Sequence, residues 1–399
     1  MTREEHHARK AQEQHKKEMA RKHYLAGKGS MDIPFLLLTL LLTGIGLMML
    51  FSASFPSAYY ETGSAGYYFK RQAIFAAVGV VVMLIVARVN YQRWRGAAKF
   101  LMILAIFLLL LVIIPGVGIT KNNATRWLGV DGVLTFQPSE IAKLAVIVYF
   151  ADSISKKKER MRDLREGILP YGIRLAVIAL LMLLEPHLSG TILIVGTGAI
   201  MMAVGGMPAW LIGAGVGGVA AAAWGFVALV DAGIISYGAS RINMWHNPWL
   251  DSSDQGYQMV QSLIAIGSGG LLGTGLGKGR QKFLYLPEES NDFIFSTVCE
   301  ELGLIGASLI LLVFALLLLR GFWIALHARD RFGTLLVVGV MSHLGLQVFL
   351  NVAVVTGLLP ATGISLPFFS YGGTALMLQL VEIGLVLSVS RQIPAKREG

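Results

Sequence analysis

Three carboxylates are the side chains best placed for chemistry in this 399-residue chain. Glu288, Glu289 and Asp292 lie in residues 285–295, which read Tyr-Leu-Pro-Glu-Glu-Ser-Asn-Asp-Phe-Ile-Phe, just before a long apolar run. Such a carboxylate can accept a proton from a hydroxyl within hydrogen-bond reach. Asp292 and Glu288 are also candidate ligands for Mg²⁺ or Mn²⁺, which bind carboxylate oxygens. The acids could instead cap the helix that the apolar run predicts, and the two roles are compatible.

Several cations lie in other segments predicted to face the same side of the protein. Arg126 stands in one predicted loop, and Lys143 follows Glu140 by three residues near the start of an apolar run. This spacing indicates either a structural salt bridge or part of a site for pyrophosphate, which Arg and Lys bind well. Lys70 and Arg71 end another predicted loop, where anchoring at the membrane surface is the simpler interpretation.

A glycine-rich basic run precedes the carboxylates. Residues 273–280 read Gly-Thr-Gly-Leu-Gly-Lys-Gly-Arg, with Lys278 inside and Lys282 just beyond. The run lacks the order of a phosphate-binding P-loop, so it predicts a flexible loop that approaches a phosphate through backbone N–H groups. His187 follows a Glu-Pro pair at a predicted turn, where a lone histidine is usually structural.

Residues 357–373 must also break a helix, because they contain two prolines and four glycines. Irregular backbone at membrane depth has to line a cavity or be buried in protein. This segment, which includes Ser370, is therefore either a turn or a cavity wall facing the Asp292 loop.

Composition identifies a polytopic helical membrane protein. Hydrophobic residues make up 55% of the chain and charged residues 15%, with a mean hydropathy of +0.63, whereas a soluble domain carries about 25% charged residues. The single cysteine excludes a disulfide framework within the chain. The net charge of +10 does not indicate nucleic-acid binding, because basic residues of such proteins gather in cytoplasmic loops.

About ten transmembrane helices are predicted, so the fold class is all-α. They cover 34–51, 72–89, 99–115, 139–153, 170–186, 189–205, 208–231, 294–319, 333–355 and 371–390. Most of the 34 Lys and Arg residues fall in the two tails and in the loops on the same side of the predicted spans, so both termini are predicted to be cytoplasmic.

The predicted organisation has three parts. Residues 1–33 form a basic cytoplasmic tail, residues 34–390 the transmembrane domain, and residues 391–399 a second cytoplasmic tail. A long extracellular loop, 232–293, joins spans 7 and 8. Its aromatic and apolar residues predict ordered re-entrant or interfacial helices there.

Together these motifs resemble the SEDS family (shape, elongation, division and sporulation), which includes FtsW, RodA and SpoVE. The resemblance runs over about residues 34–389. It rests on the segments 69–72 (Phe-Lys-Arg-Gln), 126–127 (Arg-Trp), 136–140 (Phe-Gln-Pro-Ser-Glu), 285–295, 300–303 (Glu-Glu-Leu-Gly) and 351–373. Tyr285 makes the chain more similar to the FtsW and SpoVE branch than to RodA.

The resemblance implies a peptidoglycan glycosyltransferase in the bacterial cytoplasmic membrane. Such a protein polymerises lipid II at the outer face in division, elongation or sporulation, beside a class B penicillin-binding protein acting as transpeptidase and other divisome or elongasome membrane proteins. Asp292 matches the family's essential aspartate and would take the proton from the attacking sugar hydroxyl. The expected substrate-binding residues are Arg126, Lys143, Glu140, Lys278, Lys282, Lys70, Arg71, Glu288 and Ser370, with Mg²⁺ or Mn²⁺ bridging the pyrophosphate.

The sequence departs from the family pattern at one position, and two functions other than glycosyl transfer stay open. His187 stands where the family often has an aspartate, so His187 must take the role of that aspartate or the role is dispensable. A transporter that flips lipid II would also need a cavity and broken helices. The acids cluster outside the predicted membrane centre, which does not favour transport. A non-enzymatic scaffold for division proteins would leave the carboxylates and cations unexplained.

Overall fold

A computed structural model describes residues 29–121, 124–130, 134–232, 245–252 and 256–393. Most of the predicted N-terminal tail, part of the C-terminal tail and parts of the 232–293 loop lie outside these described residues.

Ten helices overlap the ten predicted spans one to one. Seven of them are long and apolar enough to cross a membrane, and α7 and the first part of α8 are shorter apolar helices. The helices are α2 (Ile33–Thr62), α3 (Tyr67–Arg88), α4 (Trp94–Ile113), α5 (Pro138–Lys157), α6 (Leu169–Leu184), α7 (Leu188–Val204), α8 (Ala209–Asp231), α11 (Ile294–Leu326), α12 (Arg331–Val355) and α13 (Gly373–Ser390).

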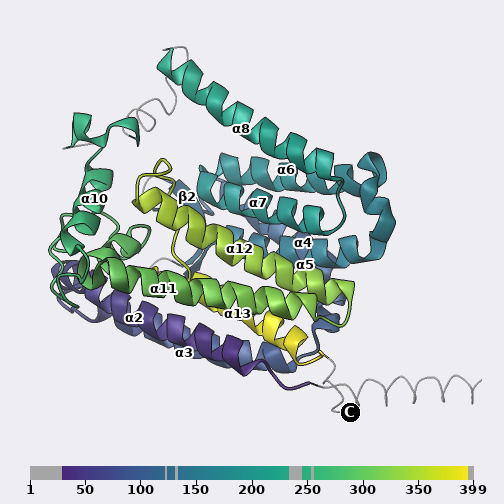
Figure 1. Ribbon diagram of the computed structural model, residues 1–399, viewed down its shortest axis with the longest axis horizontal. Coiled ribbons are helices and arrows are strands. Elements are labelled where there is room, and N and C mark those ends of the chain that lie inside the picture. The colour runs from purple at the N-terminus through teal and green to yellow at the C-terminus, as the bar shows by residue number, and fades with distance from the viewer. Residues whose placement is uncertain (1–28, 122–123, 131–133, 233–244, 253–255, 394–399) are drawn as a thin grey trace, which may run out of the picture.

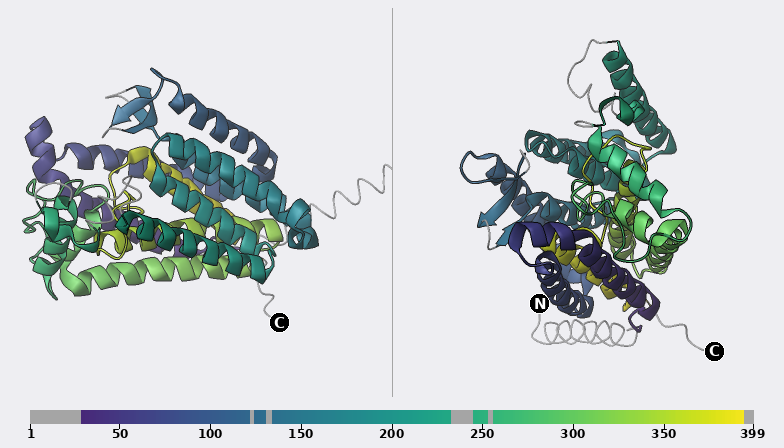
Figure 2. Two further views of the ribbon diagram at one scale, coloured as in Figure 1. Left: turned by 90° about the horizontal axis from the view of Figure 1, so that it is seen from above. Right: turned by 90° about the vertical axis from the view of Figure 1, so that its left-hand side faces the viewer.

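The helices form one bundle with α12 and α13 at its centre (Figures 1 and 2). About 70% of the apolar stretch of α12 is buried, against about 30% for peripheral helices such as α4, which keep an apolar surface for lipid. Helix α8 leans away from the others at the edge of the bundle (Figure 1).

Both ends of the described chain meet at one end of the bundle, here called the terminal end. The backbone N–H of Asp32 donates to Ser390 Oγ at 3.2 Å. Arg320, near the end of α11, forms an ion pair with Asp32 at 2.9 Å. This pairing agrees with the prediction that both termini lie on one side of the membrane.

Two predicted loops are more ordered than expected. Residues 52–71 are helical except for a short turn at 63–66, because the Ser, Ala and Tyr residues that lower hydropathy there still permit a helix. Residues 116–138 contain a small antiparallel sheet in the order β1 (Ile119–Lys121), β2 (Ala124–Val130) and β3 (Leu134–Phe136). The fold is thus nearly, and not wholly, helical, since Thr, Ile and aromatic residues favour strands here.

The long loop before α11 contains the predicted ordered helices. A 3₁₀ turn, η4 (Pro248–Asp251), and helix α10 (Tyr257–Gly269) are present. The glycine-rich run then folds against the first turns of α11, where Glu301 accepts from the Gly277 N–H at 2.9 Å and Glu300 from the Arg280 N–H at 2.6 Å. The loop is therefore pinned to two buried carboxylates.

Candidate active site

Asp292 lies at the opposite end of the bundle from the termini, in the loop that leads into α11. Residue Phe293 is the N-cap position of α11, and no described residue donates a hydrogen bond to the Asp292 carboxylate. The interpretation of Asp292 as a helix cap therefore has no support. A half-buried carboxylate without an assigned bond is available to a substrate.

The environment of Asp292 tunes its acidity. Burial raises the pKa of Asp292 to about 6, the negative charge of Glu288 adds to the rise, and the positive charge of Arg126 opposes it. A base with a pKa just below neutral is ionised at pH 7 and still holds a proton well. Glu288 itself accepts from Asn291 Nδ2 at 2.5 Å.

The helix-breaking segment 357–372 forms a wall against the Asp292 loop. Ser370 Oγ donates to the carbonyl oxygen of Asn291 at 2.7 Å, and the Tyr371 N–H donates to the carbonyl oxygen of Ser290 at 2.8 Å. The segment therefore packs against the Asp292 loop, as predicted, and its interpretation as the wall of a cavity stays a prediction. Ser370 acts here through the backbone that carries Asp292.

Asn351 holds the Asp292 loop and the 357–372 segment together. Asn351 Nδ2 on α12 donates to the carbonyl oxygens of Asp292, at 2.8 Å, and of Ile364, at 2.6 Å. Gly363 has φ +71°, and a Cβ atom there would lie 3.1 Å from Asp292 Oδ2. Only glycine leaves this side of the carboxylate open.

Arg126 connects Asp292 to the turn between α6 and α7. From β2, its guanidinium donates to the carbonyl oxygens of Glu185, at 3.2 Å, and Pro186. The positive charge of Arg126 acts on both Asp292 and His187. Arg126 reaches the site because it lies on β2, a strand that the sequence did not predict.

The predicted pair of Lys143 and Glu140 is present at the start of α5. Lys143 Nζ lies 2.7 Å from Glu140 Oε1, with only 5% and 11% of the two side chains exposed. Burial, Arg126 and Lys143 together lower the pKa of His187 to about 3, so His187 is neutral and Lys143 belongs to the same cluster of charges.

Glu185 is a buried carboxyl that sequence reasoning did not select. It is 2% exposed, and neither carboxyl oxygen has a hydrogen-bond partner among the described residues. Burial raises its pKa to about 8, with Arg126 opposing the rise. Glu185 is therefore a neutral acid at pH 7, and its only sequence signal is its place before Pro186 and His187 at a predicted outer turn.

The other predicted cations lie in different surroundings. Lys282 is fully buried and pairs with Glu301 at 2.6 Å, also donating to Ser52 Oγ at 3.0 Å. Lys278 is exposed on the glycine-rich loop, and Lys70 is exposed on the first turn of α3.

The neighbour of Lys70 faces the wall segment. Arg71 is half-buried and contributes a hydrogen bond to Tyr371. The next residue, Gln72, donates to the carbonyl oxygen of Ser370 at 3.2 Å and accepts from the Gly372 N–H at 3.1 Å. The first turn of α3 therefore supports the wall from behind.

We next consider whether side chains of the described residues could hold a metal ion without a substrate. Among the described residues, no three or more His, Cys, Asp or Glu side chains gather in a group that could hold an ion. Asp292 and Glu288 give two carboxylates, which suits a Mg²⁺ ion that takes its remaining oxygens from substrate phosphates and water.

Comparison with known proteins gives long matches. A family model described as "Cell cycle protein" and named for FtsW, RodA and SpoVE matches residues 33–394. Stage V sporulation protein E of Bacillus subtilis (strain 168) is 44% identical over 366 residues, covering 91% of this chain and 98% of that protein. The probable peptidoglycan glycosyltransferase FtsW of Geobacter sulfurreducens is 42% identical over 364 residues, covering 91% and 95%.

Solved structures share the fold. A chain from a study described as "Structural coordination of polymerization and crosslinking by a peptidoglycan synthase complex" has a TM-score of 0.73 and 26% identity, covering 90% of this chain and 98% of that one. The rod shape determining protein RodA of Thermus thermophilus has a TM-score of 0.66 and 27% identity, covering 91% and 97%.

Proposed function

This chain belongs to the FtsW, RodA and SpoVE family of cell cycle proteins, and we propose that Asp292 is the general base of its glycosyl transfer. Like the relatives it matches, it is a multi-pass protein of the cytoplasmic membrane and a peptidoglycan glycosyltransferase. The observation that carries the proposal is the half-buried Asp292 carboxylate, which accepts no hydrogen bond from the described residues and has a pKa raised to about 6.

The proposed step joins two lipid II molecules, or a glycan strand and lipid II. Asp292 takes the proton of the GlcNAc C4 hydroxyl while that oxygen attacks the anomeric carbon of the strand. The bond from this carbon to the pyrophosphate oxygen breaks, and the lipid pyrophosphate leaves with the electron pair. Because a pyrophosphate leaves readily once its charge is neutralised, cations matter more than a general acid.

Arg126 and Lys143 are the cations suited to this neutralisation. Arg126 acts electrostatically on Asp292, and both act on His187, so their charges converge on one region. A charge-assisted hydrogen bond to an anion is worth about 1.5–3 kcal/mol, enough for each to change the rate by tenfold or more. With Mg²⁺ or Mn²⁺ present, Asp292 and Glu288 would hold the ion, which would add further charge neutralisation.

Assembly with a transpeptidase is the second part of the proposal. The structural neighbour with a TM-score of 0.73 comes from a peptidoglycan synthase complex that coordinates polymerisation and crosslinking. We infer for this chain a class B penicillin-binding protein as partner, alongside other divisome or elongasome membrane proteins.

The structure gives no specific support to lipid transport. The bundle centre holds one buried ionisable pair, His343 Nδ1 and Glu382 Oε2 at 3.1 Å, among the described helices. The void beside it, lined in part by Lys143 and Thr197, has no room for a water molecule. No hydrated path therefore leads away from this pair through that void.

Asp292→Asn tests the general base. Asn keeps the size of the side chain but cannot accept the proton, so with partner and lipid II present we expect glycan synthesis to fall by roughly 10²–10⁴. Glu289→Gln is the matched control, because Glu289 is a buried carboxyl of the same loop whose side chain is hydrogen-bonded to Ser57. A near-normal rate for Asp292→Asn, in protein that melts normally, would end the proposal.

A further inference from the structure

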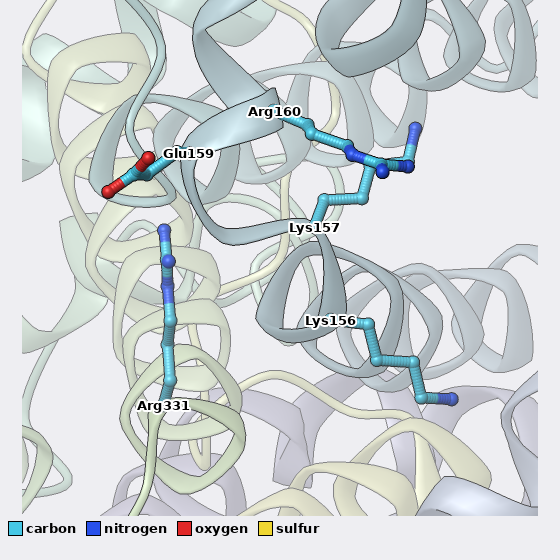
Figure 3. A pocket seen from close by; sticks show the side chains of 5 residues that line it. All are labelled: Lys156, Lys157, Glu159, Arg160 and Arg331. Atoms are coloured by element: carbon cyan, nitrogen blue, oxygen red, sulfur yellow. The ribbon is translucent and has the colours of Figure 1, made fainter.

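A basic cavity of about 830 Å³ lies at the terminal end of the bundle, far from Asp292. Its lining side chains are Lys156, Lys157, Glu159, Arg160 and Arg331 (Figure 3). Four cations and a single carboxylate thus line this space, with Arg331 pointing toward Glu159 and Lys157 and Arg160 on the other side (Figure 3). The Lys/Arg distribution assigns this end to the cytoplasmic face of the membrane.

The cavity is built by segments that are far apart in the chain. Lys156 and Lys157 end α5, Arg160 belongs to the 3₁₀ turn η2 (Lys158–Arg162), and Arg331 begins α12. Arg331 is held in place by donating to the carbonyl oxygen of Gly205 after α7. This arrangement differs from a single loop rich in cations, because folding brings cations from distant segments to the lining of one cavity.

Most of this positive charge is not neutralised by the protein. Lys156 pairs with Asp152 at 2.6 Å, but no ion pair between described residues engages Lys157, Arg160 or Arg331. Lys157 instead donates to the carbonyl oxygen of Glu166, whose carboxylate attracts it electrostatically without forming an ion pair. Like charges held together repel each other, so an anion entering this space relieves that repulsion.

The cavity also borders lipid-facing surface. Lys157 Nζ lies 4.9 Å above the ring of Tyr171 on α6. On the same helix, Leu169 and Ile173 are 50% and 54% exposed, as expected for side chains that contact acyl chains. Cations at a helix end beside such a surface sit at the depth of phospholipid headgroups.

We propose that this cavity binds the phosphate of an anionic phospholipid headgroup, with its acyl chains against α6. The phosphate oxygens accept from Arg160, Arg331 and Lys157, and Glu159 limits the charge that the cavity tolerates. Arg guanidinium groups suit this role because they bind phosphate through two parallel N–H donors.

The test measures binding to the full-length protein, independently of glycan synthesis. Phosphatidylglycerol, phosphatidylcholine and inorganic phosphate are titrated separately into detergent-purified protein, with thermal melting and native mass spectrometry as readouts. We expect phosphatidylglycerol to raise the melting temperature and remain bound, and the other two to do neither.

Paired variants localise the effect. Arg160→Gln with Arg331→Gln should weaken phosphatidylglycerol binding about thirtyfold, since each cation near a membrane surface contributes about a fivefold factor. The matched control is Arg93→Gln with Arg329→Gln, two exposed cations at the same end but outside the cavity, which should bind as the wild type does. If the double variant fails to fold, Arg160→Gln alone should still show about a fivefold loss.

Two outcomes would overturn the proposal. Equal binding by the wild type and the cavity variants would show that the lipid binds elsewhere. Protection by inorganic phosphate as strong as that by phosphatidylglycerol would assign the cavity to a free anion in place of a lipid.

Discussion

The pH dependence of glycan synthesis gives the sharpest test of the site. Burial moves the pKa of Asp292 from its ordinary 3.8 to about 6. Since only the ionised base accepts a proton, the rate at subsaturating lipid II should rise with pH and level off above about 7. At pH 5, one unit below the pKa, about a tenth of the protein is ionised and the rate should be about a tenth of the plateau.

Two variants should move this transition in opposite directions. Glu288→Gln removes the like charge that raises the pKa of Asp292, so the transition should shift to lower pH. Arg126→Gln removes the opposing charge, so it should shift to higher pH. Burial, the largest cause, remains in both variants, so neither should bring the midpoint back to 3.8.

The assay is the initial rate of strand formation from lipid II with the partner transpeptidase, from pH 4.5 to 8 at constant ionic strength. The midpoint is compared, not the plateau, because Arg126→Gln should also weaken pyrophosphate binding. A midpoint near 4, the same midpoint in both variants, or an unchanged transition in the residual activity of Asp292→Asn would refute this account of Asp292.

Three further predictions concern stability and topology. Lys143→Met leaves Glu140 buried without its partner and should cost about 3–5 kcal/mol, seen as a lower melting temperature that Glu140→Gln restores in the double variant; no loss would show that the pair is not buried in solution. The folded protein favours the neutral form of Glu185, whose pKa rises from its ordinary 4.5 to about 8. The contribution of Glu185 to stability is therefore complete below pH 4.5 and is lost as the pH rises through about 8. The melting temperature should therefore fall across this window, and a slope that persists in Glu185→Gln would assign the effect to another group. Single cysteines replacing Arg329 and Ser252, in a cysteine-free background, should differ in intact cells, with an impermeant thiol reagent labelling only position 252; equal labelling contradicts the predicted topology.

Local sequence sufficed for the helices but not for their ends. An apolar run marks each helix position, and in seven helices, among them α12 and α13, it is long enough to span a bilayer. The end of α2 was missed because its last turns hold Ser and Tyr residues that reduce hydropathy without disfavouring a helix. Strand β2 was missed because short strands give little periodic signal.

The candidate site was predictable only where charge stands out against apolar surroundings. Asp292 and the Lys143–Glu140 pair have that property. Glu185 does not, since a single acid at a turn gives no sign of being buried. The partner of Lys282 was also beyond sequence reasoning, because the pair with Glu301 forms only when the loop folds back onto α11.

That folded-back loop has a consequence for how the protein enters the membrane. Acids within a transmembrane segment oppose its transfer from the translocon into lipid. Glu300 and Glu301 enter with α11, and their neutralising groups, the loop N–H donors and Lys282, are synthesised earlier. The ribosome thus delivers the compensating donors before the acids, and on the predicted topology biogenesis of α11 depends on a loop that is translocated first.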